Sequence, residues 1–122
     1  MQKTSYIILG YVSKESAAEV PFCALSWLSN ETHSPIVTIH LHANWQRMIP
    51  DQHSDYISAL IQDWSQHSID DPNALICTLR ELSVGPVRTV KVGTTTRAAL
   101  QTIVNKYLKP ESPVRAWSSP LA

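Results

Sequence analysis

The residues with the clearest capacity for chemistry are two histidines, His40 and His42, which stand two positions apart in segment 36–43. In a strand this spacing puts both imidazoles on one face about 7 Å apart, where they could share a zinc ion. A third ligand would have to come from elsewhere, and the two cysteines lack any zinc-type spacing. We therefore interpret the pair as part of a polar strand face, and we expect no metal and no cofactor.

A second candidate is segment 92–97, Val-Gly-Thr-Thr-Thr-Arg, which we expect to turn from a strand into a helix. Backbone N–H groups at a helix N-terminus attract anions. Thr94, Thr95, Thr96 and Arg97 are therefore a candidate anion site. The segment lacks the spacing of a P-loop or of a dinucleotide turn, and a threonine N-cap is the alternative interpretation.

The charges are divided unevenly along the chain. Residues 1–71 hold three basic and eight acidic side chains, whereas residues 72–122 hold seven basic and two acidic ones. Arg80, Arg88 and Lys91 are therefore candidate nucleic-acid contacts, with Trp27 as a stacking surface. The formal net charge of zero is unfavourable for such a function, and folding can mix the two halves in space, so nucleic-acid binding is the alternative rather than the first hypothesis.

The sequence offers no arrangement that is typical of catalysis. There is no Gly-x-Ser-x-Gly elbow. Cys23 and Cys77 both lie inside apolar runs and are expected to be buried. We expect a protein that is not an enzyme, and a small metal- or ligand-dependent enzyme is the least favoured alternative.

The element around which the chain is organised is a predicted helix over residues 49–68. Ile57, Leu60, Ile61 and Trp64 recur at helical spacing on one side, with serine and glutamine on the other. Such an apolar stripe needs a partner surface, and the flanking segments are typical of strands.

Five strands are predicted on the basis of β-branched and aromatic runs, over residues 5–12, 22–28, 36–43, 74–82 and 87–92. A second helix is predicted from the Thr-rich segment to residue 109. The order β-β-β-α-β-β-α favours an α+β fold with a mostly antiparallel five-stranded sheet and two helices on one face. Residues 1–109 would form a single domain, and the Pro/Ser-rich residues 110–122 a C-terminal tail.

This arrangement leaves the other face of the sheet open. Strand alternation assigns Thr38, His40 and His42 to that face. One of the two faces of the second strand must lie on the same side. It carries either Cys23, Leu25 and Trp27 or Phe22, Ala24, Ser26 and Leu28. We interpret this surface as the binding surface of a small non-catalytic adaptor or regulatory protein, which binds a second copy of itself or another protein.

No run is long enough to span a bilayer, and Lys14 and Glu15 interrupt the first apolar run as a signal peptide would not. We therefore expect a cytoplasmic protein that does not bind membranes. The element order is similar to that of small secretion chaperones and related adaptor folds. Those usually have an additional N-terminal helix and an acidic surface, which this chain lacks, so the resemblance implies a fold and not a function.

Overall fold

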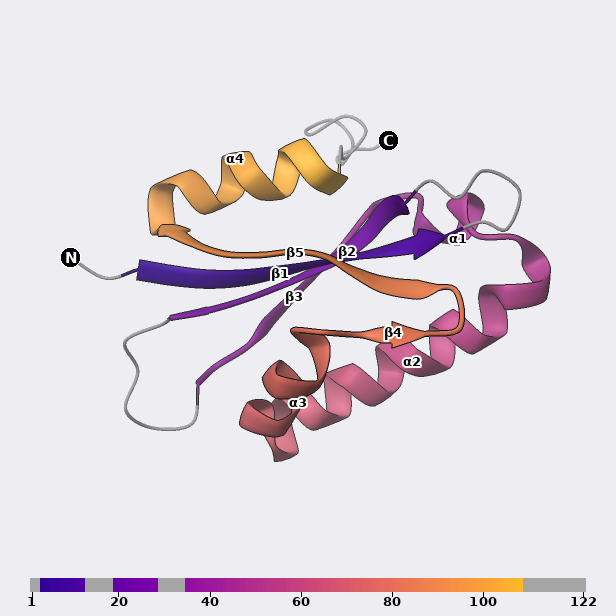
Figure 1. The fold of residues 1–122 in the computed structure, drawn as a ribbon, viewed down its shortest axis with the longest axis horizontal. Coiled ribbons are helices and arrows are strands. Elements are labelled where there is room, and N and C mark those ends of the chain that lie inside the picture. Colours follow the sequence, from indigo (N-terminus) through magenta and orange to yellow (C-terminus); the bar gives the residue numbers. More distant parts are fainter. Residues whose placement is uncertain (1–2, 13–18, 29–34, 109–122) are drawn as a thin grey trace.

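The computed structural model describes residues 3–12, 19–28 and 35–108, which form a five-stranded antiparallel sheet with four helices (Figure 1). The strands are β1 (Lys3–Val12), β2 (Glu19–Leu28), β3 (Thr38–Leu41), β4 (Ser83–Val84) and β5 (Val87–Thr96). The helices are α1 (Trp45–Met48), α2 (Asp51–Asp70), α3 (Pro72–Leu79) and α4 (Arg97–Leu108). The predicted α+β class and antiparallel sheet are confirmed.

The sheet has the strand order β3-β2-β1-β5-β4, which places β1 at its centre. Ile7, Ile8 and Leu9 are consecutive in β1 and are all completely buried. Because successive side chains of a strand point to opposite faces, both faces of the sheet are covered at β1.

The helices lie on opposite faces of the sheet, so the prediction that they share one face is wrong (Figure 1). On one face, Ile7 and Leu9 pack with Trp64 of α2 and Leu79 of α3. On the other face, side chains of α4 complete a second core, made of Tyr6, Ile8, Ala24, Val104 and Leu108. The prediction failed because the apolar stripe of a helix requires a partner surface but does not specify which of two faces supplies it.

Helix α2 carries the predicted stripe. Ile57, Ile61 and Trp64 are buried and Leu60 is half-buried against the same core. Pro50 precedes the helix and Asp51 lies in its first turn, where a negative charge interacts favourably with the helix dipole. Asp71 ends it, with its backbone N–H donating to the carbonyl of His67 at 2.8 Å.

The predicted strand over residues 74–82 is wrong, because most of this segment forms α3. The Asp71 carboxylate accepts a hydrogen bond from the backbone N–H of Ala74 at 3.2 Å, and Pro72 occupies the first turn. An acidic N-cap followed by proline is a strong helix start. The strand β4 that follows has two residues only.

A tight turn at residues 85 and 86 joins β4 to β5. Gly85 has a φ of 56°, which glycine adopts without steric cost. The predicted start of the second helix at Gly93 is wrong, since β5 continues to Thr96 and α4 begins at Arg97. Thr96 caps α4, its Oγ1 accepting from the backbone N–H of Ala99 at 3.2 Å.

The two cysteines are free and differ in environment. Cys23 is buried in β2, and desolvation raises the pKa of its thiol to about 12. Cys77 is exposed on α3, so the expectation that it is buried is wrong.

The predicted tail 110–122 lies outside the described residues. Among the helices that the structure does describe, none has the length and apolarity required to cross a membrane.

Candidate functional site

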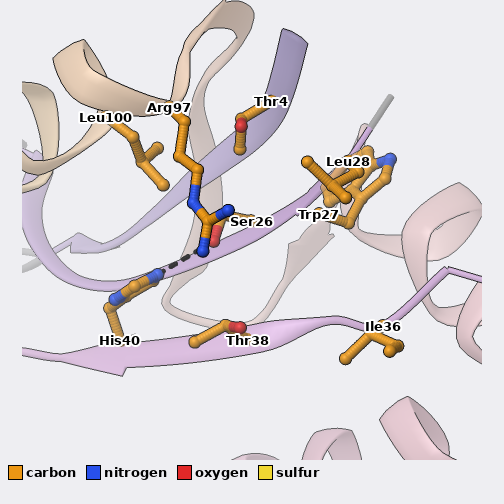
Figure 2. Close-up of a pocket in the computed structure, with 9 residues that line it drawn as sticks. All are labelled: Thr4, Ser26, Trp27, Leu28, Ile36, Thr38, His40, Arg97 and Leu100. Carbon is orange, nitrogen blue, oxygen red and sulfur yellow. Dashed lines mark hydrogen bonds between the residues drawn. The ribbon is translucent and has the colours of Figure 1, made fainter. Parts of the chain in front are cut away.

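Helix α4 packs on β1, β2 and β5 and leaves a cleft beside β3, which we call the β3 cleft (Figure 2). Its volume is about 350 Å³, at the lower end of the range for small-ligand pockets. The described residues that line it come from β1, β2, β3, α4 and the segment before β3: Thr4, Ser26, Trp27, Leu28, Ile36, Thr38, His40, Arg97 and Leu100. The cleft is the part of the predicted open face that α4 leaves uncovered.

Strand register brings these side chains together. Ser26 pairs with Thr38 in β3 and with Tyr6 in β1, while Thr4 pairs with Leu28. Paired residues of an antiparallel sheet share a face, so Thr4, Ser26, Leu28 and Thr38 all point to the α4 side. Helix α4 begins directly after Thr96, which pairs with Lys3, and its first turn therefore lies over the start of β1.

The half-buried His40 forms the floor of the cleft together with Ser26. Its Nε2 lies 3.0 Å from the Ser26 hydroxyl, a hydrogen-bond distance. Desolvation lowers the pKa of His40 below its ordinary value of 6.5, because burial disfavours the charged imidazolium. His40 is therefore neutral near pH 7 and serves as a hydrogen-bonding group rather than as a cation.

Arg97 supplies the positive charge of the cleft. Figure 2 shows its side chain extending from the first turn of α4 across Ser26 toward His40. It has no hydrogen bond or ion pair with any of the described residues. None of the described lining residues is acidic, so none of them compensates the charge of the guanidinium group.

Thr4 is the most unusual lining residue. It is only 4% exposed, and its Oγ1 has no hydrogen-bond partner among the described residues. Leaving a buried hydroxyl without a partner costs about 1–3 kcal/mol, so native structures rarely contain one. The cleft thus holds a hydroxyl group to which none of the described residues offers a hydrogen bond.

The residues of the predicted binding surface are divided between several places. Thr38 and His40 line the cleft. Trp27 also borders it but is only 7% exposed and packs into the core with α2, so the premise that it lies on an open face is wrong. His42 follows β3, and its Nδ1 accepts from the backbone N–H of Asn44 at 2.9 Å.

Only one residue of the predicted anion site lines the cleft. Thr94 and Thr95 lie within β5 opposite Ser5 and Thr4, so they are not in a strand-to-helix turn as the prediction required. Thr96 caps α4. Arg97 alone lines the cleft.

The three predicted nucleic-acid contacts have separate environments. Arg80 caps the end of α3. The Arg88 guanidinium donates to the Gly85 carbonyl at 2.6 Å, within its own hairpin. The Lys91 ammonium lies 5.9 Å from the centre of the Tyr107 ring. None of the three lines the β3 cleft.

Three lining residues, Thr4, Ile36 and Leu100, were not predicted as part of the site. Ser26 and Leu28 belong to one of the two registers considered for β2, and the structure has that register. Among the described residues, no group of three His, Cys, Asp or Glu side chains could hold a metal ion. Comparisons of the chain with protein-family models, curated proteins and solved structures gave no match.

Proposed function

We propose that this protein is a small non-catalytic adaptor that binds an extended segment of another protein at the β3 cleft. The observation that carries the proposal is the position of β3 at the edge of the sheet beside a cleft that is mostly apolar. The outer side of β3 has no partner strand within the described residues. A peptide can add to such an edge as another strand, while its side chains enter adjacent pockets.

The apolar side of the cleft supports the same function. Ile36 is 86% exposed although it is large and aliphatic, and it lines the cleft together with Leu28 and Leu100. An exposed aliphatic residue next to an unpaired strand edge is typical of a surface that another chain covers.

A selection from displayed random peptides tests this function. One library should carry the random segment at a free C-terminus, and a second should carry it internally. Peptides that bind the wild-type protein are expected to lose about tenfold or more in affinity for Ile36→Lys, because the lysine puts a charge at the apolar wall. Isothermal titration calorimetry measures the affinities.

Ile69→Lys is the matched control, since Ile69 is also strongly exposed, at 77%, but lies near the end of α2. It should leave peptide affinity unchanged. Failure to enrich any peptide, or equal binding to Ile36→Lys, would reject the proposed function.

Self-association is a second form of protein binding that the structure favours. β4 pairs with Val87 and Arg88 of β5, and the backbone N–H of Thr89 donates to the Leu82 carbonyl. Residues 90–96 of β5 therefore have no partner strand on their outer side in the described part of the chain. Lys91 is the only charged residue in 90–96, and Val92 there is 44% exposed. Long edges with few charges tend to pair with another chain, and two copies of β5 can pair antiparallel about a two-fold axis.

We expect the wild-type protein to be a dimer by sedimentation equilibrium. Val92→Lys should shift it to the monomer, because the two new lysines lie near each other across the axis and like charges repel. Ile69→Lys again serves as the control and should remain dimeric. A wild-type monomer, or a Val92→Lys dimer of unchanged affinity, would exclude this interface.

A further inference from the structure

The β3 cleft carries one positive charge, that of the exposed Arg97, which no described residue balances. Arg97 lines the cleft with no ion pair, and its neighbours there are neutral or apolar. His40 does not add a second positive charge near pH 7, as its burial favours the neutral imidazole. A ligand with a single negative charge would therefore neutralise the cleft, whereas a phosphate dianion would leave one charge uncompensated beside the apolar wall.

The buried hydroxyl of Thr4 is a second, independent indication of a ligand with a hydrogen-bonding anionic group. Its Oγ1 is buried without a partner among the described residues, and Figure 2 shows Thr4 and Leu100 on either side of the Arg97 side chain. A hydroxyl can donate one hydrogen bond and accept others. A carboxylate bears two acceptor oxygens, so one can pair with a guanidinium while the other accepts from a hydroxyl.

We propose that the β3 cleft binds the C-terminal carboxylate of the partner segment, held by the Arg97 guanidinium and the Thr4 hydroxyl. The side chain of the segment's last residue packs on Leu28, Ile36 and Leu100, and an aliphatic residue therefore suits that position. This inference rests on the proposed function, because it specifies which part of a protein segment enters the cleft. Recognition then requires that the partner segment has a free C-terminus.

The peptide selection gives the first test. Sequences that end in an aliphatic residue should be enriched from the library with a free C-terminus and not from the internal library. Each selected peptide is then synthesised with a C-terminal carboxylate and with a C-terminal amide. The amide form should bind about tenfold more weakly, since it loses a charge-assisted hydrogen bond.

Arg97→Gln should reduce the affinity for the carboxylate peptide by about tenfold and leave that for the amide peptide nearly unchanged. Arg97→Lys should retain part of the affinity, because it keeps the charge but not the bidentate geometry. Arg80→Gln is the matched control. Arg80 is an exposed arginine at the end of α3, outside the cleft lining, and its replacement should have little effect.

Thr4→Val removes only the hydroxyl and keeps the branched shape. We expect weaker binding of the carboxylate peptide with no loss of protein stability, because the hydroxyl has no partner among the described residues. A purely structural role for Thr4 predicts the opposite pattern, with lower stability and equal effects on both peptide forms. Thr95→Val is the matched control, since Thr95 pairs with Thr4 across the sheet but does not line the cleft.

The outcomes separate this inference from the function on which it rests. Equal binding of carboxylate and amide peptides, with sensitivity to Ile36→Lys but not to Arg97→Gln, would overturn the carboxylate site and leave the peptide-binding function standing. No enrichment of any peptide would reject both. The free acid 4-methylpentanoate is the last probe. Binding of this acid as tight as that of the peptides would overturn the chain end as the ligand.

Discussion

Replacing Trp64 with alanine is expected to lower the free energy of unfolding by about 3–5 kcal/mol, the usual cost of removing a large buried aromatic side chain. Trp64 is 4% exposed and belongs to the core between α2 and the sheet. Small domains have total stabilities of about 5–15 kcal/mol, so the variant should lose a large part of its stability. The effect is large because Trp64 belongs to the apolar stripe through which α2 packs in the core against the sheet.

A urea titration followed by circular dichroism measures this loss. Ile69→Ala is the control, because Ile69 lies on the same helix but is 77% exposed. Its replacement should change stability by about 0.5 kcal/mol or less. A loss below about 1 kcal/mol for Trp64→Ala would contradict the packing of α2 on the sheet.

The position of α2 could be predicted because several local signals agree. A proline and an aspartate precede the apolar stripe, the stripe has helical spacing, and Asp71-Pro72 ends it. These signals lie within one segment and depend on no distant contact. The strands β1 and β2 were predictable for the same reason, since each is a run of β-branched and aromatic residues.

The placement of α2 and α4 on opposite faces of the sheet depends on contacts between distant segments, yet the sequence contains one signal for it. Ile7, Ile8 and Leu9 are consecutive and apolar, so β1 requires cover on both faces. Two helices on a single face cannot supply that cover. Combining this run with the stripe of the second helix would have predicted α4 on the face opposite α2.

Helix α3 was missed because its apolar residues suit either a strand or a helix. Leu75, Ile76 and Leu79 are buried, and their spacing of one, three and four positions is that of a helical face. The Asp71-Pro72 pair marks a helix start. The prediction treated it only as the end of the preceding helix, although one residue can serve both helices.

The β3 cleft could be predicted only in part, because its members come from distant segments. Thr38 and His40 follow from the alternation of β3, and Arg97 was a candidate for another reason. Thr38, His40 and Arg97 lie in one cleft because of the β2–β3 register and the direction in which α4 leaves β5. Thr4 has no sequence signal, since a threonine in a strand is ordinary until its hydroxyl is found without a partner.

Replacing Gly93 with valine is expected to destabilise the protein, although valine is the better strand residue. Gly93 pairs with Tyr6 across β1 and β5, and a Cβ at this position would lie 2.7 Å from the Tyr6 Cζ. Tyr6 is 5% exposed and packs under Val104 and Leu108 of α4, which limits its movement. The higher strand propensity contributes at most about 1 kcal/mol, whereas overpacking costs up to about 3 kcal/mol.

The net expectation is a loss of about 2 kcal/mol in the free energy of unfolding, measured by urea titration. A double-mutant cycle with Tyr6→Leu identifies the cause, because leucine vacates the space that the ring occupies above Gly93. In the Tyr6→Leu background, Gly93→Val should cost less than in the wild type, and the difference is the coupling energy of the pair. An equal cost in both backgrounds would show that the ring does not exclude side chains at position 93. α4 packs on Tyr6 and also carries Arg97. Gly93→Val should therefore lower peptide affinity in the wild-type background, and this loss should be absent in the Tyr6→Leu background.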